Sequence, residues 1–313
     1  MYIEQAFKGL HDWWRYTLGV LVVFIAWQLI GMLPLGIAIG IKALSGDGIS
    51  IPNNIPQMIE LLGSNLFLFL MLISFAFGLL GVFVSAKTLH KLSITQLTTR
   101  RSKIDWKRFW FIFIVWGGVS SSLILLDYFL SPEDYQFNFQ LQPFLILAVI
   151  GILLIPIQTS FEEYFFRGYL MQGLGVVFKN NWVPLLLTSI GFGLMHLANP
   201  EVEKLGYTIM VYYIGTGLFL GILTLMDDGL ELALGFHAAN NLFTALLVTA
   251  DWTAFQTHSV FKDLSDPSET MLFEIFVPVL VVFPILLFIL SKKYKWSNWK
   301  AKLTGTIQHK EKE

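Results

Sequence analysis

The stretch FLILAVIGILLIPIQTSFEEYFFRGYLMQG, residues 144–173, decides what kind of fold this chain can adopt. About 20 apolar residues in a helix are enough to cross roughly 30 Å of hydrocarbon, so this stretch can span a membrane. It also contains two adjacent carboxylates and an arginine, Glu162, Glu163 and Arg167. An ionisable side chain near the bilayer centre costs about 2.5 to 3.5 kcal/mol on insertion scales, so we expect these three residues to serve a function.

The composition of the whole chain indicates a polytopic membrane protein. Of its 313 residues, 55% are hydrophobic and 14% are charged, and the mean hydropathy is +0.64, whereas soluble domains carry about 25% charged residues. The formal net charge of -1 and the lack of a basic domain predict that no nucleic acid is bound, because phosphates must be neutralised by Lys and Arg. The absence of cysteine excludes disulfides, thiolate metal sites and a cysteine nucleophile.

Eight stretches are apolar and long enough to be candidate membrane spans. In chain order they are residues 16–41, 66–86, 109–129, 144 to about 173, 182–197, 209–226, 232–250 and 272–290. The first is longer than the core of a signal peptide and has no small-residue cleavage site, so we expect it to be retained. The predicted fold is therefore all-α, a polytopic membrane bundle of about eight transmembrane helices.

Lys and Arg would gather on one side of such a bundle. With an even number of spans both termini share a side, and this side would hold Lys8, Arg15, the basic link 87–108, Lys179 and the basic tail from Lys292 onward. The opposite side would hold only Lys42, Lys204 and Lys262. Because positive residues are retained in the cytoplasm, both termini are predicted to be cytoplasmic in a multi-pass protein of the cell membrane. We expect the basic link to face lipid headgroups.

Two features predict how the spans pack. Gly217 and Gly221 are four residues apart, a small-xxx-small pair that lets another helix approach closely. Pro156 should kink the fourth span or loosen its backbone hydrogen bonding, since proline has no N–H to donate.

The charged residues of the fourth span divide into a pair and a single residue. Glu163 and Arg167 are four apart, so on a helix they share a face and can neutralise each other. Glu162 points about 100° away and cannot be held by Arg167 in the same way. We therefore expect the partners of Glu162 to come from other helices.

Two of the six histidines, His196 and His237, fall inside predicted spans. A single buried histidine would be interpreted as a hydrogen-bonded contact between helices, but two of them with an unpaired glutamate predict a functional site. Asn241 follows His237 by four residues and shares its helical face. Asn240 points about 100° away and is expected either to contact a neighbouring helix or to serve as an additional hydrogen-bond donor.

A carboxylate, two imidazoles and an amide are sufficient for hydrolysis by an activated water molecule. A glutamate hydrogen-bonded to a histidine can accept a proton from water as a general base. Imidazole and amide N–H groups can hold the oxyanion of the tetrahedral intermediate. Two histidines and a carboxylate could instead bind a catalytic zinc ion, although the HExxH motif is absent.

Three motifs resemble those of a known family, the CAAX-protease and bacteriocin-processing proteins, also called Abi proteins, which include the type II CAAX prenyl endopeptidases. EExxxR runs from Glu162 to Arg167, FxxxH from Phe192 to His196, and HxxxN from His237 to Asn241. Their order, and their places in the fourth, fifth and seventh spans, also agree with this family. The resemblance covers residues 144–250.

The resemblance implies an intramembrane endopeptidase acting on membrane-embedded or lipid-anchored proteins or peptides. It implies that Glu162 and His196 activate the water molecule, while His237 and Asn241 form the oxyanion hole. The resemblance also divides the chain: residues 1–143 would form a three-span region, residues 144–250 the catalytic core, and residues 251–313 the last span and a basic cytoplasmic tail.

The same resemblance implies that Glu163 and Arg167 hold the first motif in shape. Members of the family were long described as metalloproteases, yet similarity to the prenyl endopeptidases implies metal-independent catalysis, so no cofactor is expected. The alternative is zinc, which would take Glu162, His196 and His237 as ligands. Two other functions stay open: a transporter or channel whose ionisable residues relay protons or bind a cation, and a regulator built on a protease fold.

Helix geometry raises a difficulty for this site. At about 1.5 Å per residue, straight helices would place Glu162 and His237 toward the cytoplasmic side and His196 roughly 20 Å further along the fifth span. We therefore expect helices that are tilted, broken or offset, or a fifth helix that begins deeper than Trp182. On this basis the active site is predicted to lie toward the cytoplasmic side.

Overall fold

The computed structural model describes residues 1–45, 51–266 and 273–307. These residues form a bundle of helices with one small sheet, which confirms the predicted all-α membrane fold. The first elements are η1 (Ile3–Lys8), α1 (Trp13–Phe24), η2 (Ile25–Ile30), α2 (Leu33–Leu44), α3 (Ile55–Leu62), α4 (Ser64–Thr88), α5 (Ile94–Thr98), α6 (Trp106–Leu130), η3 (Pro132–Asp134) and β1 (Tyr135–Phe137). They are followed by α7 (Leu141–Glu163), η4 (Tyr164–Leu170), α8 (Met171–Phe178), α9 (Trp182–Leu194), α10 (Pro200–Leu205), η5 (Gly206–Ile209), α11 (Met210–Asp227), α12 (Glu231–Leu247), β2 (Val248–Thr249), β3 (Phe261–Asp263), η6 (Pro278–Val282), α14 (Phe283–Tyr294) and α15 (Trp299–Thr304).

Six helical segments of the described chain are long and apolar enough to cross a membrane. They are Trp13–Leu44, Ser64–Thr88, Trp106–Leu130, Leu141–Phe178, Pro200–Asp227 and Phe273–Tyr294. Residue 272, where the last span was predicted to begin, lies outside the described residues. The total of about eight spans therefore stays a prediction.

The predicted fifth and seventh spans are shorter than the sequence indicated. In place of 182–197, α9 has 13 residues, about 20 Å at 1.5 Å per residue, and it ends at Leu194 because the backbone then turns ahead of Pro200. In place of 232–250, α12 has 17 residues and ends where β2 begins. Both helices carry motif residues and pack against the longer helices. A criterion based on length alone would therefore miss them as members of the membrane bundle.

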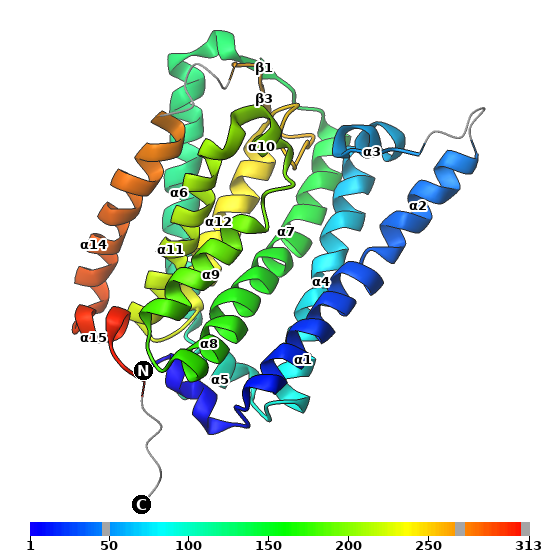
Figure 1. The fold of residues 1–313 in the computed structure, drawn as a ribbon. Coiled ribbons are helices and arrows are strands. Elements are labelled where there is room, and N and C mark those ends of the chain that lie inside the picture. The colour runs from blue at the N-terminus through cyan, green and yellow to red at the C-terminus, as the bar shows by residue number, and fades with distance from the viewer. Residues whose placement is uncertain (46–50, 267–272, 308–313) are drawn as a thin grey trace, which may run out of the picture.

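The helices lie roughly side by side, and α7 runs through the middle of the bundle (Figure 1). Its neighbours are α4 on one side and α12 on the other, while α12 also packs on α6 and α9 packs on α11. The N-terminus, α5, α8 and α15 lie at one end of the bundle, and α3, α10, β1 and β3 lie at the opposite end (Figure 1). We call these the terminal end and the sheet end.

The glycines of α11 pack as predicted. A Cβ atom on Gly217 would lie 2.8 Å from the carbonyl oxygen of Ser189, and one on Gly221 would lie 2.5 Å from Leu185 Cδ1, so both glycines allow α9 to approach closely. The helix α7 continues through Pro156, and the departure from α-helical geometry comes later, in the π-helical η4. Single π-helical turns inside α-helices are frequent at functional sites.

A three-stranded sheet closes the sheet end in the order β1-β3-β2. β1 pairs antiparallel with β3, placing Tyr135 opposite Asp263. β2 pairs parallel with β3, placing Val248 opposite Phe261. These strands have only two or three residues, which is too short for an alternating pattern in the sequence to reveal them.

The terminal end is held by ion pairs from the basic link. Arg101 donates to Asp227 Oδ2 at 2.9 Å and to Glu231 Oε2 at 3.1 Å, and Arg108 donates to Asp227 Oδ1 at 2.5 Å. These two arginines are 26% and 20% exposed, so the expectation that the basic link faces lipid headgroups is wrong for them. They turn inward because they neutralise carboxylates in the turn between α11 and α12.

Candidate active site

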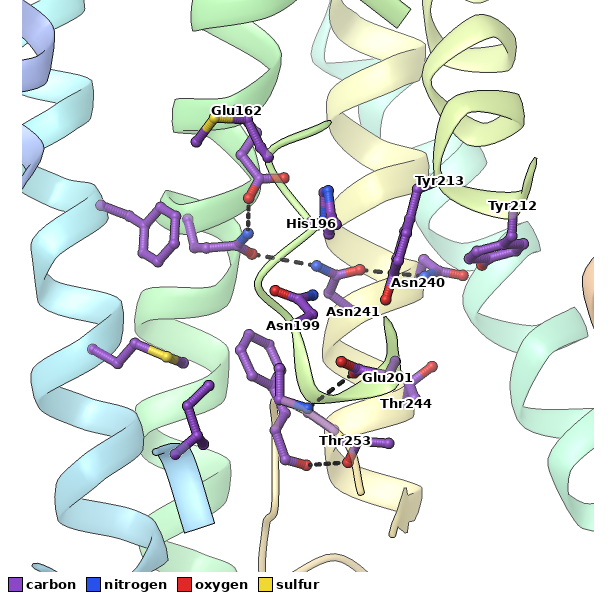
Figure 2. Close-up of a pocket in the computed structure, with 18 of the residues that line it drawn as sticks. Glu162, His196, Asn199, Glu201, Tyr212, Tyr213, Asn240, Asn241, Thr244 and Thr253 are labelled. Carbon is purple, nitrogen blue, oxygen red and sulfur yellow. Dashed lines mark hydrogen bonds between the residues drawn. The ribbon is translucent and has the colours of Figure 1, made fainter. Parts of the chain in front are cut away.

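A cavity of about 440 Å³ lies inside the bundle, between α7, α12 and the segment that follows α9. Glu162, His196 and Asn241, which come from three different helical regions of the sequence, all face it (Figure 2). Aromatic side chains such as Phe161, Phe165 and Phe192 supply much of the remaining lining. The cavity is thus mostly apolar, with a few convergent polar groups, as ligand sites usually are.

Behind the cavity lies a fully buried charge cluster. Arg167 Nη1 donates to Glu163 Oε1 at 2.9 Å, and both side chains are 0% exposed, so the pair predicted from the i, i+4 spacing is formed. Arg167 Nη2 also donates to the carbonyl oxygen of Gly217 at 3.1 Å, and the guanidinium lies 4.4 Å from the ring centre of Phe192. These contacts fix the first motif against α11 and against the second motif.

His237 joins this cluster through Glu163. Its Nδ1 lies 2.9 Å from Glu163 Oε1, while its Nε2 lies 3.5 Å from Glu162 Oε2. The sequence had grouped His237 with Glu162, but the hydrogen bond is made to the neighbouring glutamate. Because Nδ1 is held by Glu163, the histidine ring is oriented with Nε2 toward Glu162.

Both glutamates have one buried oxygen without a hydrogen-bond partner in the described chain, but Glu162 has one partner on its other oxygen whereas Glu163 has two. Gln158 Nε2 donates to Glu162 Oε1 at 2.5 Å, whereas Glu162 Oε2 is buried and has no hydrogen-bond partner among the described residues. The distance of 3.5 Å from that oxygen to His237 is too long for a good hydrogen bond. One carboxylate oxygen is therefore held in place and the other is left available.

Gln158 is the last member of a chain of amide groups. Trp116 Nε1 donates to Asn240 Oδ1 at 3.1 Å, and Asn240 Nδ2 donates to Asn241 Oδ1 at 3.2 Å. Asn241 Nδ2 then donates to Gln158 Oε1 at 3.3 Å, and part of this chain is drawn in Figure 2. Every bond donates in the same direction, and the chain ends on Oε1 of Glu162, which accepts the last hydrogen bond from Gln158.

His196 lies just beyond the end of α9. Its Nδ1 is 2.8 Å from the carbonyl oxygen of Phe192, and since a carbonyl only accepts, Nδ1 carries the proton. In the neutral ring Nε2 then has a free lone pair. The ring stacks on Tyr213 with 4.4 Å between centroids and an interplanar angle of 21°, and this stacking holds it at the cavity.

Straight helices were predicted to place Glu162 and His196 at different depths in the membrane. The length of the helical segment that contains Glu162 removes this difference. The fifth helix does begin at Trp182, so the expectation of a deeper start is wrong. Instead, α7, η4 and α8 together make a helical segment of 38 residues, Leu141–Phe178, longer than the predicted span. Glu162 therefore lies well inside the bundle, at the level that His196 reaches from the opposite direction.

Sequence reasoning missed Gln158, Trp116 and Tyr213. Gln158 could have been found, since it precedes Glu162 by four residues and so shares its face. Trp116 and Tyr213 give no such signal, because their contacts depend on how α6 and α11 pack. Asn240 was predicted to contact a neighbouring helix, and it does so through Trp116 of α6.

The predicted zinc ligands do not form a ready metal site. Among the residues that the structure describes, no three His, Cys, Asp or Glu side chains are grouped closely enough to hold a metal ion. The Nδ1 atoms of His196 and His237 are bonded to Phe192 and Glu163, which leaves both Nε2 atoms free and so does not itself decide against a metal ion. Because Glu162, His196 and His237 are not grouped closely enough, their arrangement does not fit a zinc ion as it stands, and we derive no step through one.

Fold and cavity together define a polytopic helical membrane protein with a carboxylate, imidazole and amide site inside the bundle. Residues 141–243 match the family described as Type II CAAX prenyl endopeptidase Rce1-like. The uncharacterized protein YyaK of Bacillus subtilis (strain 168) is 32% identical over 248 residues, which cover 77% of this chain and 80% of YyaK. No solved structure matches the chain significantly. The chain belongs to the Rce1-like family, as the three motifs indicated.

Proposed function

We propose that this protein is an intramembrane endopeptidase that hydrolyses peptide bonds of membrane-embedded or lipid-anchored substrates. The observation that supports this most directly is the state of Glu162: one oxygen is held by Gln158, and the other is buried, unpaired and beside His237. A buried acceptor without a partner costs about 1 to 3 kcal/mol, and a water molecule in the cavity would satisfy it.

In the first step, a water molecule between Glu162 and His196 attacks the carbonyl carbon of the scissile bond. Glu162 accepts one proton of the water, and His196 Nε2 accepts a hydrogen bond from the other, which orients the oxygen for attack. The carbonyl π-electrons move onto the oxygen, giving a tetrahedral oxyanion. Asn241 Nδ2 and a protonated His237 Nε2 donate to that oxyanion.

In the second step the intermediate collapses and the C–N bond breaks. Glu162 returns its proton to the leaving nitrogen, so the products are a carboxylic acid and an amine, and the enzyme is regenerated. The buried pair of Glu163 and Arg167 takes no proton in this scheme. It keeps His237 turned toward the reacting group and fixes the helix that carries Glu162.

The test uses purified protein in liposomes that contain a library of membrane-anchored peptides, with products identified by mass spectrometry. We expect Glu162→Gln to lower the cleavage rate by about 10²- to 10⁴-fold, the usual contribution of a general base. Glu133→Gln is the matched control, because Glu133 is exposed and lies at the sheet end. Unchanged cleavage by Glu162→Gln would contradict the mechanism, and ion flux without proteolysis would indicate a transporter.

Metal dependence is measured on the same preparation. Because Glu162, His196 and His237 are not grouped as metal ligands in the described chain, we expect cleavage that persists in a chelator, with little zinc bound to the purified protein. One tightly bound zinc ion per chain, together with loss of cleavage in the chelator, would instead establish the zinc-dependent reaction and require the three side chains to rearrange.

A further inference from the structure

The cavity leads from the catalytic residues toward the sheet end of the bundle. Beyond Glu162 and His196 its lining continues to Asn199 on the way into α10, to Thr253 in the loop after β2, and to Asp263 at the end of β3. Among the described residues, none from η1, α5, α8 or α15 lines it. The cavity therefore extends away from the terminal end, where the N-terminus and α15 lie (Figure 1).

The basic residues lie at the other end. Those of the described chain that belong to the terminal end are Lys8, Arg15, Lys87, Lys91, Arg100, Arg101, Lys103, Lys107, Arg108, Lys179, Lys292, Lys293, Lys295, Lys300 and Lys302. The sheet end has Lys42, Lys204 and Lys262. An excess of this size in short loops orients membrane proteins with the basic end in the cytoplasm.

We propose that the cavity receives its substrate from the non-cytoplasmic face of the membrane. This inference rests on the proposed function and narrows its substrate class to exported peptides and to segments of membrane proteins that emerge on that face. It differs from the prediction of an active site toward the cytoplasmic side, for which the depth of Glu162 was counted from a helix end at about Gly173. The helix in fact continues to Phe178, and the cavity extends in the other direction.

The chain has no cysteine, so single cysteines can be introduced and labelled without background. Glu203→Cys reports on the sheet end, Thr244→Cys on the cavity and Ser102→Cys on the terminal end, and all three residues are exposed. Each variant is treated with a charged, membrane-impermeant maleimide in intact cells and again after permeabilisation. We expect Glu203→Cys and Thr244→Cys to be labelled in intact cells, and Ser102→Cys to be labelled after permeabilisation.

The reversed pattern would overturn the inference. It would also be overturned if Glu203→Cys is labelled in intact cells but Thr244→Cys is labelled only after permeabilisation. If Thr244→Cys fails to react even in detergent, Thr253→Cys serves as the cavity reporter. Labelling does not depend on proteolysis, so this experiment can fail or succeed separately from the proposed function.

A different observation concerns the charge of the cavity. Its lining contains the carboxylates of Glu162, Glu201 and Asp263 and no Lys or Arg. Glu201 Oε1 accepts the backbone N–H of Ala254 at 2.9 Å, while its Oε2 is buried without a hydrogen-bond partner among the described residues. Figure 2 shows Glu201 beside Asn199, on the sheet-end side of Glu162 and His196.

From this arrangement we infer that Glu201 binds a positively charged group of the substrate, either a Lys or Arg side chain or a terminal ammonium. Such a group would supply the donor that the unpaired oxygen lacks, and a charged donor makes the stronger hydrogen bond. The nearby amide of Asn199 and the ring of Tyr213 give the cation further polar and aromatic contacts. The remaining acidic lining would also repel anionic segments.

The test compares two peptides that differ in one residue, Lys or its uncharged isostere norleucine, scanned across the positions next to the cleaved bond. Glu201→Gln is expected to lower kcat/KM about 10- to 100-fold for the Lys peptide at one position and to change it little for the norleucine peptide. Equal losses for both peptides would overturn the inference. If no peptide is cleaved, binding of the fluorescently labelled pair to wild type and Glu201→Gln gives the same comparison.

Discussion

The bundle contains two clusters of buried charge, and they differ in how completely their polar atoms are paired. At the terminal end, both oxygens of Asp227 and both of Glu231 accept hydrogen bonds. Beside the cavity, Glu162 Oε2, Glu163 Oε2 and Arg167 Nε are all buried without partners in the described chain. Burial of charge therefore does not by itself distinguish a functional site from a structural one.

The two clusters differ in the number of their unpaired polar atoms, although Asp228 Oδ1, next to Asp227, is also buried without a partner in the described chain. Each one costs free energy that a folded protein normally avoids, and Glu162 Oε2 belongs to a residue that lines the cavity, where a water molecule or a substrate could satisfy it. The cluster at the terminal end, in which the carboxylates of Asp227 and Glu231 are fully hydrogen-bonded, instead connects the start of α6 to the turn between α11 and α12. The two clusters should consequently respond differently to substitution.

The largest effect on stability is expected for Arg167→Met. It removes the guanidinium from Glu163 and leaves His237 as the one side chain bonded to that buried carboxylate, and breaking a buried pair costs about 3 to 5 kcal/mol. Thermal unfolding in detergent measures the loss. The double variant Glu163→Gln/Arg167→Met is the control and should recover most of the stability, since no lone charge remains. If the single and double variants unfold alike, the loss of stability does not come from the charge left on Glu163.

A smaller loss of about 1 to 2 kcal/mol is expected for Asp227→Asn. Its partners Arg101 and Arg108 are 26% and 20% exposed, so water can solvate them when the carboxylate is lost. Peptide cleavage should stay close to that of wild type, because this cluster lies away from the cavity. A large drop in cleavage with intact folding would show that the two clusters are coupled.

Gln158→Ala should act mainly on the reaction. It removes the donor that holds Glu162 Oε1, and we expect about a tenfold lower cleavage rate with a change in unfolding temperature smaller than that of Arg167→Met. Gln158→Glu keeps the shape but cannot donate when ionised, so it should be at least as impaired. Full activity in both variants would mean that the amide chain does not position Glu162.

The smallest expected effect is a dependence of stability on pH through His90, which lies near the terminal end and outside the spans. Burial lowers the pKa of His90 below its ordinary value, so the folded state favours the neutral ring. Its stabilising contribution is complete above the unfolded pKa of about 6.5 and is lost as the pH falls through the lower folded value. Unfolding followed by circular dichroism from pH 7.5 to 5 measures this loss.

His90→Gln is the control for the pH series. The neutral histidine is held on both sides, with Nδ1 2.7 Å from the carbonyl oxygen of Leu10 and Nε2 2.8 Å from the hydroxyl of Tyr169. The glutamine variant should be less stable at pH 7.5 and should have a flatter pH profile. An unchanged profile would assign the dependence to other groups.

The sequence by itself determined the class of the protein and the relations within each helix. Composition established a membrane protein, since too few charged residues are present for a soluble surface. Spacing of four residues predicted the pair of Glu163 and Arg167, and it would have predicted Gln158 beside Glu162. These relations follow from 3.6 residues per turn, which holds whatever the helix packs against.

Tertiary structure alone decided how the motifs meet. Whether His237 bonds to Glu162 or Glu163 depends on the rotation of α12 about its axis relative to α7, and the sequence does not specify that rotation. The same packing aligns the amide chain from Trp116 to Glu162 across three helices. The direction of the cavity depends on where α9 stops and how far the central helix continues. Apolar residues continue through both boundaries, so hydropathy could not locate them.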